Sequence, residues 1–259
     1  MNTRALVIAS LLLLPIQAAA QTRRPWVTED LATLGSGKAE VQLGFAFDDA
    51  FVSPALPLEG RLLSVPTIAL AAGLGGRAEF QLLFPAWNRL SPDAGESMSS
   101  VGDVVIATKI RIVGGVDGKP GLGFRYRVKL PNAAETKGVG SDTTDFYADV
   151  LAAASLGSLR VHGSLGLQIL GDPLKAASQN DLFGYGVVAE WPVGKGAVGV
   201  EVEGVIGPDV TDTTTLRGGG RIDLGRVTVD GALSHKWRGD LKGVGATAGV
   251  TIPVSLGGG

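Results

Sequence analysis

Residues 121–130 read GLGFRYRVKL, and this stretch decides the fold. Its apolar residues alternate with three cations, which gives two sets of side chains: Leu122, Phe124, Tyr126, Val128 and Leu130 against Arg125, Arg127 and Lys129. Successive side chains of a β-strand point to opposite sides of the sheet. The stretch therefore predicts a strand with one apolar face and one charged face.

The same alternation recurs along the chain, for example at 38–47, 78–84, 104–112, 146–152 and 244–254. The pattern predicts about twelve strands, an even number, each near the roughly 9–11 residues that cross a bilayer at a tilt. An even number of similar antiparallel strands is typical of a transmembrane barrel.

The connections between the expected strands alternate in length. The short ones fall at 73–76, 113–119, 156–158, 192–196 and 224–226, and the long ones at 48–60, 88–100, 131–144, 171–181, 207–213 and 235–242. Short turns at one end and long loops at the other are typical of outer-membrane barrels. The predicted fold class is all-β: a transmembrane antiparallel up-and-down barrel of about twelve strands.

The charges decide which face of the sheet meets lipid. In hydrocarbon every backbone polar group needs an internal partner, so the sheet has to close on itself. A charged exterior would cost roughly 2–4 kcal/mol for each Arg or Lys at the bilayer midplane, so the apolar face has to point outward. A soluble β-sandwich or lipocalin-like barrel shows the same periodicity. Four aromatic residues expected near strand ends favour the membrane: Trp87, Tyr126, Trp191 and Trp237.

The first twenty residues look like a targeting segment. Arg4 precedes an apolar stretch at 6–16, and the alanines at 18–20 fit the small-x-small rule of signal-peptide cleavage. We expect cleavage after Ala20 and export to the outer membrane. The expected division is a signal peptide at 1–20, an N-terminal arm at 21–37 and a barrel at 38–256.

Composition narrows the function classes. The 259 residues include no cysteine, so disulfides and thiol chemistry are excluded. The formal net charge is −2, and no basic face invites nucleic acid. Thirty-nine glycines suit turns and close strand packing rather than long helices.

The polar faces supply the candidate lumen and selectivity residues, which are Lys109, Arg111, Arg125, Arg127, Lys129, Asp145, Asp149, Glu201, Glu203, Arg217 and Arg221. The first five form a basic wall on adjacent strands, which would bias a pore toward anions or weak acids. Symmetric loops would place three pairs across from each other: Lys129 with Asp145, Arg125 with Asp149, and Glu203 with Arg217. The same charges could simply brace a solvated interior. An interior of about twelve strands could hold a narrow channel or be plugged by the arm.

Three segments resemble a known family. They are RRPWVTEDLATLGSGKAEVQLGF at 23–45, SVGDVVIATKIRI at 100–112 and YRVKLPNAAETKGVGSDTTDF at 126–146. They are similar to parts of the outer-membrane transporter family called the MetA-pathway of phenol degradation family. The positions that match its motifs are Gly102, Asp103, Lys129, Pro131, Gly140, Ser141 and Asp145. The resemblance implies an outer-membrane barrel that admits hydrophobic or aromatic compounds, and it carries over no functional residue. The chain departs from many barrels in ending without a terminal aromatic residue.

The sequence gives only weak support for an enzymatic function. His162 and Ser164 lie two apart on one strand, a spacing similar to the His-x-Ser pair of outer-membrane lipid A deacylases. Both are expected to face the lumen, where a lipid chain would not reach them. Ser234 and His235 at a loop edge are a weaker pair. Loop acids could hold a divalent cation between lipopolysaccharides, or only keep the loops soluble; they are Asp48, Asp49, Asp93, Glu96, Asp142, Asp209 and Asp212.

The sequence therefore predicts a barrel that passively admits small molecules, with no enzymatic activity, cofactor or metal. Its expected partners are outer-membrane lipid, lipopolysaccharide and a small-molecule solute; single barrels and homo-oligomers both remain open. The alternatives are a non-conducting structural or adhesion barrel and a lipid-modifying enzyme.

Overall fold

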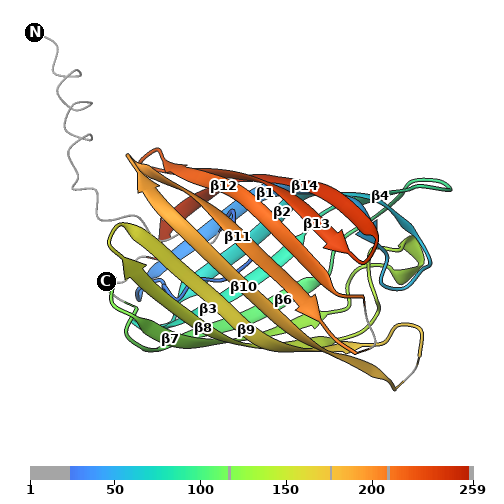
Figure 1. Cartoon of the computed structure of the whole chain (residues 1–259), viewed down its shortest axis with the longest axis horizontal. Helices are drawn as coiled ribbons and strands as arrows, with labels where there is room; N and C mark the ends of the chain where they lie inside the picture. Colours follow the sequence, from blue (N-terminus) through green and yellow to red (C-terminus); the bar gives the residue numbers. More distant parts are fainter. Residues whose placement is uncertain (1–23, 116–117, 176, 209–210, 257–259) are drawn as a thin grey trace, which may run out of the picture.

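A computed structural model of the chain describes residues 24–115, 118–175, 177–208 and 211–256 (Figure 1). Twelve strands form its barrel: β1 (Lys38–Val52), β2 (Glu59–Gly73), β3 (Ala78–Pro85), β6 (Val104–Val113), β7 (Gly121–Leu130), β8 (Asp145–Leu156), β9 (Leu159–Gly171), β10 (Gln179–Val193), β11 (Gly196–Ile206), β12 (Thr213–Asp223), β13 (Thr228–Arg238) and β14 (Leu241–Ser255). Each strand pairs antiparallel with the next, and β1 pairs with β14, from Lys38 opposite Ser255 to Asp48 opposite Gly245. The sheet is therefore closed, as predicted. The expected signal peptide lies outside the described residues.

Helical structure is minimal in the described ranges. It consists of one 3₁₀ turn at Glu135–Lys137, within the connection between β7 and β8. No helix in these ranges is long and apolar enough to cross a membrane.

Two further strands project from the barrel wall beyond β3. The expected long connection at 88–100 contains β4 (Asn88–Pro92) and β5 (Met98–Ser100). β4 pairs with the first part of β2, starting where Ser64 lies opposite Asn88. The Ser64 hydroxyl donates to the Asn88 side-chain oxygen at 2.5 Å, and Leu90 is fully buried. This segment therefore extends the sheet at the loop end instead of forming an irregular loop.

The two ends of the barrel differ, as predicted. One end, here the turn end, carries the connections 74–77, 114–120, 157–158, 194–195 and 224–227; the other, the loop end, carries the connections at 53–58, 86–103, 131–144, 172–178, 207–212 and 239–240. The expectation of a long connection at 235–242 was wrong. Arg238 pairs with Leu241, so the hairpin turns over two residues, and Gly239 has the positive φ of 56° that such a tight turn requires.

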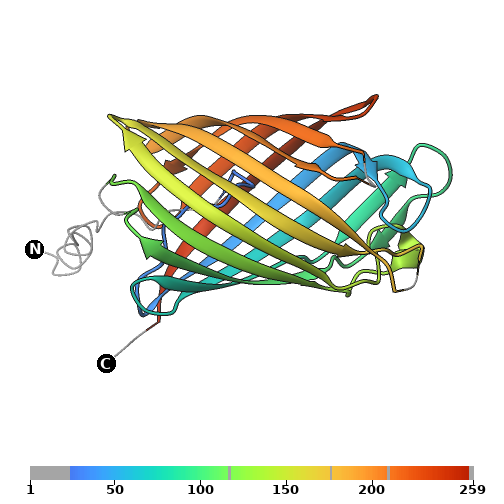
Figure 2. The ribbon, with the colours of Figure 1, turned by 60° about the horizontal axis from the view of Figure 1, so that its bottom comes forward.

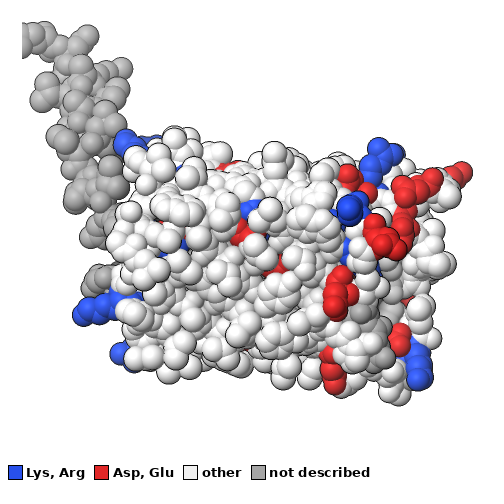
Figure 3. Space-filling model, viewed as in Figure 1, with Lys and Arg blue, Asp and Glu red and all other residues white. Residues whose placement is uncertain are grey.

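The two faces of the wall carry opposite chemistry. The outside presents large apolar side chains, among them Leu122, Val150 and Leu167 with exposed fractions of 49%, 54% and 61%. Charged side chains gather toward the ends of the barrel, and its side is mostly uncharged (Figure 3). The lumen holds buried charged groups such as Lys109 and Glu201. An apolar exterior of this kind needs lipid around it, so the barrel is a transmembrane one, with the predicted faces.

The aromatic residues confirm only part of the expected belts. Trp191 lies near the end of β10, Trp237 near the end of β13, and Trp87 just beyond β3. Tyr126 was misplaced by the prediction, because it lies in the middle of β7 with its ring 6.5 Å from that of Phe146. Alternation places Tyr126 on the outer face but does not set its depth in the bilayer.

Candidate functional site

The N-terminal arm lies inside the barrel. Its described part, residues 24–37, runs within the ring of strands before it continues into β1 (Figure 2, blue). Hydrogen bonds and ion pairs tie it to strands around the lumen: Leu34 to Glu79 of β3, Glu29 to Lys109 of β6 and Arg125 of β7, Trp26 to Glu190 of β10, Val27 and Thr28 to Glu201 of β11, and Arg24 to Asp230 of β13 and Ala248 of β14. The sequence left open a channel or a plug, and the structure places the arm across the lumen.

Glu201 is the central anchor of the arm. Its carboxylate is fully buried and accepts the backbone N–H of Thr28 at 2.6 Å and that of Val27 at 3.0 Å. The same carboxylate forms an ion pair with Arg217 on β12. A buried carboxylate with three donors is fully compensated, so this junction is a strong fixation point.

The predicted partner of Arg217 was wrong, because the actual partner is the neighbouring lumen-facing acid two residues earlier on β11. Glu201, not Glu203, lies opposite Arg217, and the guanidinium reaches Glu203 only at 3.9 Å. Both acids face the lumen, so periodicity could not choose between them. The choice depends on how the loop after β11 closes, and Val205 pairs with Thr213 there.

The expected basic wall begins with two cations that the arm neutralises. Glu29 accepts from Lys109 at 2.8 Å and from Arg125 at 2.8 Å. Lys109, almost fully buried, also lies 3.3 Å from Asp30 and 3.7 Å from Glu79. Glu29 thus bridges β6 and β7 from inside, and the arm supplies part of the negative charge that these cations need.

The other cations of the wall are also partnered. Asp149 lies opposite Arg125 and binds it at 3.3 Å, as predicted. It also binds Arg127 at 3.1 Å, and the Arg127 guanidinium lies 4.4 Å from the centre of the Tyr147 ring.

Nearer the loop end of β7, Lys129 lies opposite Asp145, as predicted, with 2.6 Å between nitrogen and oxygen. Arg111, toward the turn end, donates to the carbonyl oxygen of Gly76 at 2.6 Å. The wall is therefore an ion-pair network rather than a row of open cations.

Trp26 and Arg221 meet at Glu190. The indole N–H of Trp26 donates to one carboxylate oxygen at 3.1 Å, and Arg221 donates to the other at 2.6 Å. Sequence reasoning chose Arg221 but missed Trp26, Glu29 and Arg24, because their partners lie far away along the chain.

Glycines on the lumen face are the signal that could have revealed the arm. A Cβ at Gly186 would lie 2.1 Å from the Thr28 hydroxyl oxygen, and one at Gly123 would lie 2.4 Å from Leu31. A side chain at either position would force the arm to shift. A solvated lumen has no such requirement.

Two cavities flank the arm. The loop-side chamber, about 340 Å³, is lined by the arm and by Ala69, Leu83 and Val105, which lie side by side on β2, β3 and β6. Arg24 and Arg127 also line it. This chamber combines an apolar wall with cations that are already ion-paired.

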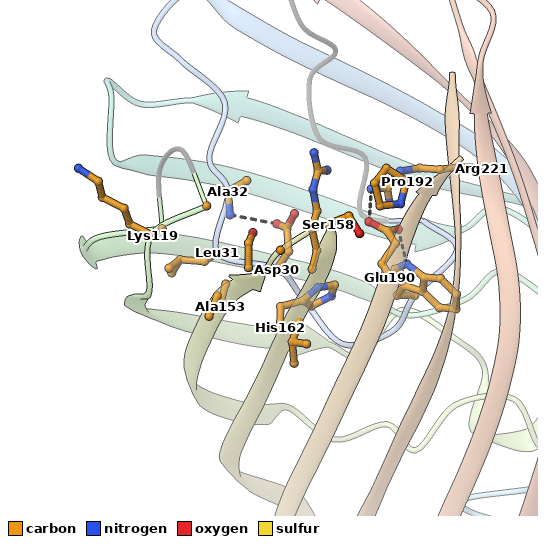
Figure 4. A pocket seen from close by; sticks show the side chains of 18 residues that line it. Asp30, Leu31, Ala32, Lys119, Ala153, Ser158, His162, Glu190, Pro192 and Arg221 are labelled. Atoms are coloured by element: carbon orange, nitrogen blue, oxygen red, sulfur yellow. Dashed lines mark hydrogen bonds and ion pairs between the residues drawn. The ribbon is translucent and has the colours of Figure 1, made fainter. Parts of the chain in front are cut away.

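The turn-side cavity is larger, about 590 Å³, and lies between the arm and the turn ends of β8, β9 and β10. Figure 4 shows Asp30 and Leu31 of the arm, with His162 and Glu190 on the strands that face them. Volumes of a few hundred cubic ångströms are in the range of small-molecule sites.

The histidine positions bear on the enzyme alternative. His162 is buried in the lumen wall, as expected, and no hydrogen bond joins it to Ser164 among the described residues. His235 packs edge-on against Trp237, with 4.5 Å between the ring centres. No group of three or more potential metal ligands comes together within the described ranges.

Comparisons with known proteins show similarity at the level of the fold. No family model and no curated protein sequence matches the chain. The translocator domain of the autotransporter NalP from Neisseria meningitidis is similar over 86% of this chain and 90% of that one, with 14% identity and a TM-score of 0.56. The transport unit of the autotransporter AIDA-I from Escherichia coli is similar over 96% of each chain, with 9% identity and a TM-score of 0.50. At such identities the likeness concerns the barrel alone, and the resemblance to the phenol-degradation transporter family stays a prediction.

Proposed function

We propose that this chain is an outer-membrane channel for the passive uptake of small molecules, in which the N-terminal arm is the constriction that a solute has to displace. The observation that carries the proposal is the arm itself, bound across the lumen with a cavity on either side. A purely structural barrel needs a filled lumen, but it does not need a cavity on either side of the segment that fills it.

The loop-side chamber supports a hydrophobic or aromatic solute. Ala69, Leu83 and Val105 put a small apolar surface inside a lumen that holds many charged groups. Because its cations already hold carboxylates, the chamber has little net field to attract ions. An uncharged, partly apolar molecule fits this surface best.

A reversible lock on the arm tests the proposal. The site of a Cβ at Gly186 lies 3.1 Å from the Thr28 Cβ, so a small shift of the arm brings the two atoms to the roughly 3.5–4.5 Å of a disulfide, and the chain has no cysteine of its own. We expect the double variant Thr28→Cys, Gly186→Cys to conduct little in planar bilayers when oxidised and to regain conductance when reduced.

The control lock leaves the arm alone. Gly231 lies opposite Ala248 on the outer face of β13 and β14, and the site of a Cβ at Gly231 lies 3.9 Å from the Ala248 Cβ. Gly231→Cys with Ala248→Cys should conduct like the unmodified protein in both redox states. Equal conductance of the oxidised and reduced arm variant would show that solutes do not pass the arm. Absence of conductance and of liposome swelling in every protein would instead support the structural or adhesion barrel.

A further inference from the structure

His162 is an unsatisfied group in the turn-side cavity. The residue is more than nine-tenths buried, and its Nε2 atom, itself buried, has no hydrogen-bond partner among the described residues. It lines the cavity together with Asp30 and Glu190 (Figure 4). A buried imidazole nitrogen without a partner costs free energy, unless something that enters the cavity binds it.

The two acids of the cavity are already occupied. Asp30 accepts from the backbone N–H of Ala32 at 3.1 Å and pairs with Lys109 at 3.3 Å. Glu190 accepts from Trp26 and Arg221. Neither carboxylate has strong need of another cation, so the acids do not make the cavity a cation site.

The cavity is also lined by a cation that has no acidic partner among the described residues. Arg160 lies on the same face of β9 as His162, two residues away, and lines the cavity. It lies opposite Glu190 in the sheet, but that carboxylate is engaged with Arg221, and no ion pair forms at Arg160 among the described residues. Lys119 stands at the rim and points away (Figure 4). Among the described lining residues, the charge that is left without an ion pair is therefore positive.

Part of the remaining lining is apolar. Leu31 of the arm, Ala153 of β8 and Pro192 of β10 contribute to it. Inorganic anions gain nothing from such a surface, whereas an organic anion buries its hydrocarbon part there. Two residues along a strand span about 7 Å, so an imidazole and a guanidinium at Arg160 and His162 can reach one carboxylate from both sides.

We infer that the turn-side cavity is a binding site for a small monocarboxylate with an apolar body. Arg160 pairs with the carboxylate, the Nε2–H of His162 donates to one of its oxygens, and the hydrocarbon part rests on Leu31 and Ala153. Charge-assisted hydrogen bonds of this kind are roughly twice as strong as neutral ones. The site does not require that the barrel conducts.

Calorimetry with hexanoate on the full chain in detergent tests the inference. One hexanoate should bind per barrel, and hexanamide and inorganic phosphate should each bind at least about ten-fold more weakly. His162→Ala and Arg160→Gln should each weaken hexanoate binding about ten-fold, and His162→Gln, which keeps a donor, should restore part of it. The matched controls His235→Ala and Arg238→Gln change the same residue types at the loop end and should bind like the unmodified protein.

Nitrogen-15 spectra of labelled histidine give a second readout that does not depend on a variant folding. Hexanoate should shift the His162 ring signals and leave those of His235 in place. Unshifted His162 signals, equal binding of hexanamide or phosphate, or full hexanoate affinity in His162→Ala and Arg160→Gln would overturn the inference. Because binding is measured without a membrane, none of these results depends on conductance.

Discussion

The carboxylate of Glu201 accepts the backbone N–H of Thr28 at 2.6 Å, in a fully buried position on the barrel wall. A side chain of β11 thereby holds the main chain of the arm, and only a substitution to proline within the arm would remove these N–H donors. The strength of this junction sets how easily the arm leaves its place, so the first prediction concerns Glu201.

Replacing Glu201 by Gln should loosen the arm. The change removes a charged acceptor from the amides of Val27 and Thr28 and leaves Arg217 without its main partner. Hydrogen bonds to charged groups contribute roughly 1.5–3 kcal/mol, so amide exchange at Val27 and Thr28 should accelerate about ten-fold or more. Glu203→Gln is the matched control, since Glu203 is an acid on the same face of the same strand. Equal exchange rates in both variants would show that Glu201 does not hold the arm.

A methyl group on the lumen wall should have a similar effect. Gly186→Ala places a Cβ 2.1 Å from the Thr28 hydroxyl oxygen, a distance that forces Thr28 to move. Gly218→Ala is its control, because a Cβ at Gly218 meets nothing within 4 Å. We expect more frequent openings in single-channel records of Gly186→Ala only. If the two variants gate alike, the arm is not packed against β10 in the membrane.

The polar faces allow a prediction about ion preference. Asp149 binds Arg125 and Arg127, and Asp145 binds Lys129. Replacing both acids by Asn removes two negative charges beside these three cations, so the reversal potential in a salt gradient should move toward anion selectivity. Asp181→Asn changes an exposed acid at the loop end and should leave the preference as it was. An unchanged reversal potential in the double variant would mean that permeating ions do not pass close to this part of the wall.

The sequence predicted the strands of the barrel wall better than the position of the arm inside the lumen. Alternation needs only neighbouring residues, so faces and strand count followed directly, as did the pairing of Lys129 with Asp145 across one symmetric loop. The pairing of Arg217 failed because two acids of equal chemistry face the lumen. The turn at Gly239 was overlooked because polar residues on both sides resembled a loop.

The sequence offered the arm as a possible plug, but its contacts could not be predicted, for a geometric reason. Trp26 and Glu190 are 164 positions apart, and they meet only once the sheet has closed. No local pattern contains that closure. The lumen-facing glycines are the sequence feature that reflects the presence of the arm. A glycine in a strand also suits turns and close packing, however, so Gly186 could not be interpreted before its contact with Thr28 was known.

Two adjacent residues of β9 test the assignment of the faces. Leu167 is 61% exposed on the outer face, whereas Gln168 points to the lumen, where its amide nitrogen lies close to Gly184. An arginine facing the bilayer midplane costs roughly 2–4 kcal/mol, so Leu167→Arg should lower the free energy of unfolding from liposomes by about that amount. Gln168→Arg adds the same charge one position away and should cost less, because the lumen offers water and carboxylates. Urea titrations of both variants in vesicles measure the difference. A larger loss of unfolding free energy in Gln168→Arg than in Leu167→Arg would mean that the two faces are assigned the wrong way round. The placement of the barrel in a membrane, which rests on its apolar exterior, would then fail as well.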